Sequence, residues 1–269
     1  MSPGLPEQWL SLAGCGFVVG FLVGLTGVGA GSLTTPILIW GFAVPPLVAV
    51  GTDLLFAAIT KASAVWRHHR LGNVDWRIMR ILAAGSLPGA LAVFVWLHFA
   101  RPDTTALAPS IRSGLALALV TSAASILIYP WATRRATTAN GPCAQPLDLT
   151  ARRTATTVVL GCLLGCLVAL TSVGAGAIGV IALACLLPAM AARRLIGTDI
   201  AHAIPLTLAC GLGHLALGNI DGALLAALLL GSVPGIALGS SATGLLPDWC
   251  LRTLLSGAVL LAAAMVWPR

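Results

Sequence analysis

The sequence predicts an all-α polytopic membrane protein made of two inverted repeats. Each repeat has a broken or re-entrant glycine-rich helix hairpin and three long transmembrane helices. Composition is the first reason: only 9% of the 269 residues are charged and the mean hydropathy is +0.98, whereas soluble domains carry about 25% charged residues. The other two reasons are a series of apolar segments long enough to span a bilayer and an ordered internal duplication.

Eight apolar segments are long enough to be transmembrane candidates, and two shorter ones follow glycine-rich breaks. The long segments cover roughly residues 9–27, 45–67, 75–98, 109–131, 152–171, 192–215, 221–243 and 249–267. The shorter segments cover about 31–41 and 175–189. No basic stretch precedes the first segment, so we expect it to be retained rather than cleaved as a signal peptide.

Four short motifs occur twice in the same order, at a near-constant offset of 145 or 146 residues. The pairs are residues 26–31 with 171–176, 51–53 with 197–199, 71–75 with 217–221, and 85–89 with 231–235. We therefore predict a first transmembrane repeat over 9–131, a cytoplasmic connection over 132–151, and a second transmembrane repeat over 152–267.

The arginines predict the orientation of the repeats. Arg67 and Arg70 lie in the turn after the third segment, whereas the equivalent turn of the second repeat, 213–219, has no Lys or Arg. Positive residues favour the cytoplasmic side. This places both termini outside and requires the two repeats to be inserted in opposite directions. Arg101, which falls outside in this arrangement, is an exception.

The paired glycine-rich breaks predict the position of a substrate site. Inverted repeats with broken helices are typical of secondary transporters, which bind substrate near the membrane midplane. Short helices are expected to restart near Ser32 and Ala177. Helix N-termini offer N–H donors and a partial positive charge, so two of them facing each other would cradle an anion. Hydroxyl groups near the breaks could add donors: Thr26, Ser32, Thr34, Thr35, Thr171 and Ser172. The alternative is that these glycines serve close helix packing.

Charged residues inside apolar segments are candidates for function because they are costly in a bilayer. Asp53 and Asp199 are equivalent positions of the two repeats, and His202 follows Asp199 on the same helical face. Lys61 has Thr207 as its equivalent, which makes it an asymmetric charge and a candidate counter-charge for an anion. A lysine can instead extend its side chain to the membrane surface.

Thr52 and Thr198 precede the two aspartates and follow a glycine in each repeat. Helix capping is an alternative role for these Thr-Asp pairs. Together, the candidate substrate-binding residues are Thr26, Gly29, Gly31, Ser32, Thr52, Asp53, Lys61, Thr171, Gly174, Gly176, Thr198, Asp199 and His202.

The ordered motifs resemble those of the sulfite exporter TauE/SafE family over about residues 10–265. They are the glycine-rich break followed by Pro36, the Gly-Thr-Asp runs, the Leu-Gly-Asn-x-Asp turns and the Gly-Ser-x-Pro-Gly runs. The resemblance implies a multi-pass permease of the bacterial inner membrane that moves sulfite, sulfonates such as sulfoacetate, or related oxyanions. The second break departs from the first at Ala169 and Ser172, which replace Gly24 and Gly27, and is therefore expected to contribute less.

The expected function is secondary transport of a small sulfur oxyanion, in the export direction and coupled to protons. A channel-like anion pore is the alternative. A membrane-embedded enzyme is disfavoured because the chain has no HExxH, GxSxG or acidic metal-binding cluster. No catalytic residue, metal or cofactor is predicted. The expected partners are the oxyanion and the lipid bilayer, without nucleic acid, because the basic residues lie at segment ends. No particular oligomeric state is predicted.

Overall fold

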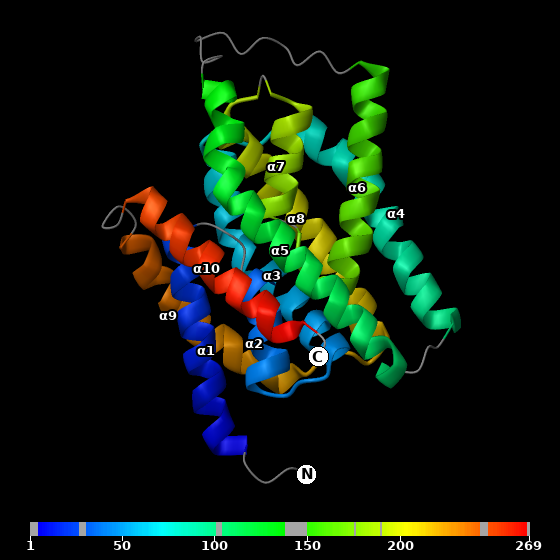
Figure 1. Ribbon diagram of the computed structural model, residues 1–269, viewed down its shortest axis with the longest axis vertical. Helices are drawn as coiled ribbons and strands as arrows, with labels where there is room; N and C mark the ends of the chain where they lie inside the picture. The colour runs from blue at the N-terminus through cyan, green and yellow to red at the C-terminus, as the bar shows by residue number, and fades with distance from the viewer. Residues whose placement is uncertain are drawn as a thin grey trace.

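The computed structural model describes residues 5–26, 31–100, 104–137, 150–174, 176–188, 190–242 and 247–267. These residues form α-helices and no strand (Figure 1). The helices are α1 (Leu5–Thr26), α2 (Gly31–Gly41), α3 (Pro46–Arg70), α4 (Trp76–Ala100), α5 (Thr104–Thr137), α6 (Ala151–Thr171), α7 (Ala177–Leu186), α8 (Ala192–Ala216), α9 (Gly222–Ser241) and α10 (Asp248–Val266). The predicted all-α polytopic fold is confirmed.

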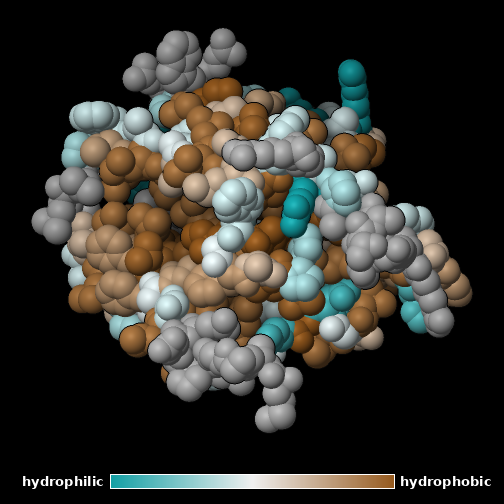
Figure 2. All heavy atoms as spheres, turned by 60° about the horizontal axis from the view of Figure 1, so that its bottom comes forward, coloured by the Kyte–Doolittle hydropathy of each residue, from teal (hydrophilic) through white to brown (hydrophobic). Residues whose placement is uncertain are grey.

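Seven of these helices are long and apolar enough to cross a membrane: α3, α4, α6, α8, α9, α10 and the part of α5 over Pro109–Pro130. Large apolar side chains such as Leu91, Leu163 and Leu230 are more than 60% exposed on the outside of the bundle. Figure 2 shows one face of the molecule on which apolar residues cover most of the visible surface. Such a surface suits lipid rather than water.

Helices α3 and α8 form the centre of the bundle. In their apolar windows, 59% and 67% of the residues are buried, against 33–44% in the five other spanning helices. The two helices pack against each other along the middle of the molecule (Figure 1). Asp53 and Lys61 of α3 and Asp199 of α8 are therefore enclosed by protein rather than by lipid.

Glycine stripes hold the outer helices close together. Helix α1 packs on α9, and α4 packs on α6 (Figure 1). At Gly161 and Gly165 of α6, an added Cβ would collide with the backbone of α4 at Leu82 and Ser86. Small residues four apart let helix backbones approach in this way. Close packing therefore explains these glycines.

The helix contacts occur in matched sets. Where α2 contacts α3 and α10, its equivalent α7 contacts α8 and α5. The contact of α1 with α9 corresponds in the same way to that of α6 with α4. Each half of the chain thus completes its packing with helices of the other half.

Replacing Gly165 by alanine is expected to destabilise the protein by about 1–3 kcal/mol, because the methyl group would push α6 away from Ser86 of α4. Gly14→Ala is the matched control, since Gly14 lies in α1 with nothing within 4 Å of an added Cβ. Alanine should be neutral or slightly stabilising there. Thermal unfolding of the purified variants measures both effects, and equal melting temperatures would contradict the packing role of Gly165.

Candidate functional site

Thr52 and Thr198 lie inside helices rather than at helix starts. Because α3 begins at Pro46 and α8 at Ala192, the two threonines do not cap their own helices. Instead, the Thr52 hydroxyl accepts a hydrogen bond from the Asp221 N–H at 3.2 Å, and the Thr198 hydroxyl accepts one from the Asp75 N–H at 2.9 Å. The capping alternative for their own helices is therefore wrong.

Asp75 immediately precedes α4, and Asp221 immediately precedes α9. The Asp221 carboxylate accepts the N–H groups of Ala223 and Leu224 at 2.9 and 3.0 Å, as a helix N-cap. The Asp75 carboxylate accepts the corresponding N–H groups of α4 and also pairs with Arg194 at 3.2 Å. Thr52 and Thr198 thus fix the start of another helix.

Asp53 is fully buried and is held by hydroxyl groups from α2 and from the second break. Its Oδ2 accepts a hydrogen bond from Thr35 of α2 at 2.6 Å and one from Ser172 at 2.7 Å. Thr34 provides a third hydroxyl interaction with the same carboxylate. Ser172 adopts a left-handed conformation (φ 60°) at the end of α6. The first turn of α2 and the second break therefore meet at a single oxygen atom.

Asp199 is equally buried but is held differently. Its Oδ1 lies directly against Gly179 in the first turn of α7, where an added Cβ would collide with it. Within the described part of the chain, neither carboxylate oxygen of Asp199 has a hydrogen-bond partner. At the offset of 145, Gly179 and Val180 stand where the first repeat has Thr34 and Thr35. The second repeat has therefore lost the hydroxyls that hold the first carboxylate.

Lys61 is buried and interacts with both carboxylates. Its side chain is only 8% exposed, and it interacts electrostatically with Asp199 and, more weakly, with Asp53. A lysine extended to the membrane surface would be exposed, so the snorkelling alternative does not fit. Apart from histidines, Lys61, Asp53 and Asp199 are the buried ionisable side chains of the described helices that carry a formal charge.

His202 completes the buried cluster one turn beyond Asp199. It is fully buried, and its Nε2 lies 2.7 Å from the Ser86 hydroxyl of α4. The charge of Lys61 also acts on its ring. Sequence reasoning missed Ser86, although it stands in the repeated Gly-Ser-x-Pro-Gly run.

The second break has the open backbone that its glycines predict. Gly174 and Gly176 have φ values of 124° and 151°, a conformation that side chains rarely adopt, and α7 begins directly afterwards. Thr171 donates its hydroxyl to Leu167 O at 2.7 Å and accepts the Val173 N–H at 3.2 Å. It therefore stabilises the end of α6.

The first break is described only in part. Gly31 is the first residue of α2, and Ser32 after it is buried. Gly29 and the side chain of Thr26 lie outside the described residues. The structure thus brings together Asp53, Asp199, Lys61 and His202 beside the first turns of α2 and α7. It assigns Thr52, Thr171 and Thr198 to other contacts.

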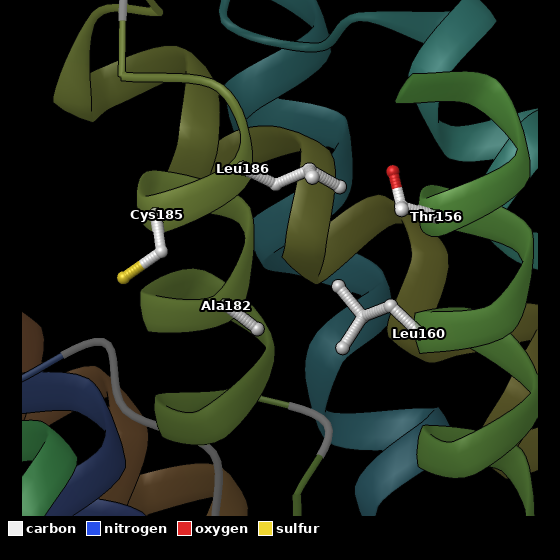
Figure 3. A pocket seen from close by; sticks show the side chains of 5 residues that line it. All are labelled: Thr156, Leu160, Ala182, Cys185 and Leu186. Atoms are coloured by element: carbon white, nitrogen blue, oxygen red, sulfur yellow. The ribbon is translucent and has the colours of Figure 1, made fainter. Parts of the chain in front are cut away.

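A groove of about 260 Å³ lies elsewhere, between α6 and α7 (Figure 3). It is lined by Thr156, Leu160, Ala182, Cys185 and Leu186. Leu160 and Leu186 point into the space between the two helices (Figure 3). None of the predicted site residues lines this groove and no charged side chain does, so it does not suit an anion. The described residues also contain no group of three His, Cys, Asp or Glu that could hold a metal ion.

Known membrane transporters resemble this chain over most of its length. Residues 12–266 match the model of a family described as sulfite exporter TauE/SafE. The chain is 38% identical over 225 residues to the probable membrane transporter protein YjnA of Bacillus subtilis, covering 84% of this chain and 86% of the relative. It is 28% identical over 257 residues to the probable membrane transporter protein YdhB of the same organism, covering 93% and 94%. No solved structure matches the chain significantly. The chain therefore belongs to the sulfite exporter TauE/SafE family of membrane transporters.

Proposed function

We propose that this protein is a secondary transporter that exports small sulfur oxyanions, such as sulfite and sulfoacetate, across the bacterial inner membrane in exchange with or together with protons. The observation that carries the proposal is the buried Lys61, which interacts with two buried carboxylates on the central helices α3 and α8. Ionisable groups at such a position are expensive and mark transport pathways.

The surroundings of Lys61 suit an oxyanion. The first turns of α2 and α7 lie beside the charged cluster, as the contacts of Asp53 with Thr35 and of Asp199 with Gly179 indicate. The first N–H groups of a helix have no partner within that helix and attract negative charge. The substrate would compete with the two carboxylates for Lys61 and for these helix ends. The family description supports sulfite as the first anion to test.

The charges of the cluster support coupling to protons. Two carboxylates and one ammonium leave the ionised cluster with a net charge of about −1, counted on Asp53, Asp199 and Lys61. An anion that enters a poorly solvated site of the same sign is strongly disfavoured. A proton that enters with the anion removes one negative charge and makes binding feasible.

An inverted arrangement of the two halves supports alternating access to this site. The matched motifs, together with the matched contacts of α1 with α9 and of α6 with α4, are those expected of two related units that pack as a pair. In transporters built this way, one repeat rocks against the other around a fixed midplane site. Helices α3 and α8 would contribute the site from the two repeats.

Two experiments test the function: a thermal-shift screen of the purified protein, and a flux assay with the protein in liposomes. Sulfite, sulfoacetate, sulfate, taurine and thiosulfate are screened for thermal stabilisation, because a ligand that binds only the folded protein raises its melting temperature. We expect sulfite or sulfoacetate to give the largest shift and to show saturable counterflow that responds to a pH gradient. Absence of stabilisation and flux with all five compounds would contradict the proposal, and flux that does not saturate would favour a channel.

The inverted topology predicts that equivalent turns face opposite sides of the membrane. A cysteine at Leu71, which is 64% exposed, should react with an impermeant maleimide only from the cytoplasmic side. Its equivalent, Leu217→Cys, should react only from the periplasmic side. Both are made in a background that lacks the seven native cysteines. Labelling of the two positions from the same side would exclude the inverted arrangement.

A further inference from the structure

We propose that the two buried carboxylates have different tasks in transport. Asp53 is a fixed anion that joins the two breaks, whereas Asp199 is an exchangeable carboxylate that releases Lys61 to the substrate when it takes up a proton. The inference rests on the proposed function, because it assigns the proton of that transport cycle to one residue.

Asp53 is held by hydroxyl hydrogen bonds that Asp199 lacks, and such bonds favour the ionised form of a carboxylate. Two hydroxyls donate to its Oδ2, Thr35 at 2.6 Å and Ser172 at 2.7 Å, while its Oδ1 receives no hydrogen bond from the described residues. These lengths are typical of hydroxyl groups bonded to a charged carboxylate. Because the donors come from α2 and from the second break, movement of Asp53 would separate two parts of the site. Its role is therefore to hold the broken helices in place.

The contacts of Asp199 leave it free to change partners. Its two oxygens receive no hydrogen bond from the described residues, and Gly179 beside it has no side chain that could donate one. Its favourable charge interaction is with Lys61. The difference follows from the residues at equivalent positions of the two repeats. Thr34 and Thr35 of the first repeat are replaced by Gly179 and Val180 in the second, and Gly27 of the first repeat is replaced by Ser172. All three substitutions give hydroxyls to Asp53 and none to Asp199.

Other groups near Asp199 limit where the proton can be held. Helix α3 contributes Lys61 and Asp53, and the ring of His68 approaches Gly197, two residues before Asp199. On α8 itself, His202 is bound to Ser86 of α4. Helix α7 contributes Gly179, and Tyr129 of α5 packs against a cluster of buried apolar residues that includes Leu195 of α8. His202 is therefore the competing proton acceptor that an experiment must separate from Asp199.

The exchange needs no chemical bond other than that to the proton. At rest, the Lys61 ammonium neutralises Asp199. When an anion arrives, one proton adds to an Asp199 oxygen and forms a neutral carboxylic acid, while Lys61 keeps its charge and pairs with the anion. On the other side of the membrane the anion leaves, Asp199 loses its proton, and the Lys61–Asp199 interaction returns. One proton thus accompanies each anion.

The experiment measures proton uptake when sulfoacetate binds to purified protein in weak buffer with a pH-indicator dye. Sulfoacetate is used because its own charge is constant from pH 6 to 8. The parent should take up about one proton per bound anion, and its dissociation constant should rise by up to about tenfold per pH unit. In Asp199→Asn, proton uptake should fall to near zero and the dissociation constant should no longer depend on pH.

Three controls distinguish this assignment from a structural effect. Thr35→Val, which removes one donor to Asp53, should lower the melting temperature and keep one proton per bound anion. Asp53→Asn should lower it further and, in the folded fraction, keep a pH-dependent dissociation constant. In His202→Gln the proton stoichiometry should survive. Proton uptake that persists in Asp199→Asn, or that is lost in His202→Gln, would overturn the assignment.

The outcome also separates this inference from the proposed function. If the parent binds sulfoacetate or sulfite without taking up protons, the division of tasks between the carboxylates and the proposed proton coupling are overturned, while the proposed transport of the anion stands. If the parent binds neither anion, the proposed function is overturned and the inference falls with it.

Discussion

Replacing Lys61 by alanine is expected to weaken binding of sulfite or sulfoacetate by about a hundredfold or more. Two unit charges about 4 Å apart attract each other by about 4 kcal/mol at an effective dielectric constant of about 20. Lys61 is the buried cation of the described helices, so no other such charge there can replace it. Isothermal titration calorimetry measures the loss. Lys61→Arg is not expected to restore full affinity, because a planar guanidinium presents its donors differently from a compact ammonium.

The same substitution also affects folding, and this effect must be separated from binding. Without Lys61, Asp199 loses its opposite charge in a buried position, which costs about 3–5 kcal/mol when one member of a buried pair is removed. The double variant Lys61→Met and Asp199→Asn removes both charges and should recover most of the stability. It should not recover anion binding. A purified Lys61→Ala protein with unchanged affinity would assign Lys61 to folding alone.

The helices of this protein could be predicted from local sequence. The third apolar segment, predicted over 45–67, is α3 (Pro46–Arg70), and the segment predicted over 192–215 is α8 (Ala192–Ala216). Lipid-facing and buried helices both need long apolar runs, so the runs mark their bounds. The short segment predicted over 175–189 is α7 (Ala177–Leu186), which is shorter at its end because Pro188 disfavours helical conformation at Leu187.

The partners of the site residues could not be predicted in the same way. Ser172 binds Asp53 from 119 positions away, and Thr52 binds the Asp221 N–H from 169 positions away. Such contacts depend on which helix faces which across the bundle, and a periodic apolar pattern does not encode this. The loss of hydroxyls at Gly179 and Val180 was visible in the sequence. Its consequence depends on the folded chain, in which Gly179 lies against Asp199.

The buried carboxylates change the interpretation of the N-termini of α2 and α7. The sequence predicted that the N-termini of the two short helices would cradle an external anion. In the structure, Asp53 and Asp199 lie beside the first turns of α2 and α7. The cradle therefore remains a proposal in which the substrate competes with the protein's own carboxylates, and this competition gives protons a role.

Replacing Gly176 by valine is expected to weaken anion binding by about tenfold or more. Gly176 precedes α7 with φ 151° and ψ −100°, which a β-branched residue cannot adopt without strain. The first N–H groups of α7 would then be displaced, and each hydrogen bond to a charged group contributes about 1.5–3 kcal/mol. Ser32→Ala, which removes one buried hydroxyl from the first turn of α2, should cost less because the backbone donors remain.

Gly218→Val is the control that separates strain from binding. Gly218 also has a positive φ, 74°, but it lies in the turn between α8 and α9 with nothing within 4 Å of an added Cβ. Valine there should lower the melting temperature through backbone strain while the affinity for the anion stays that of the parent. Calorimetric titration of both folded variants makes the comparison. If Gly176→Val binds as tightly as Gly218→Val, the backbone of the second break does not hold the anion, and its glycines serve the path of the chain alone.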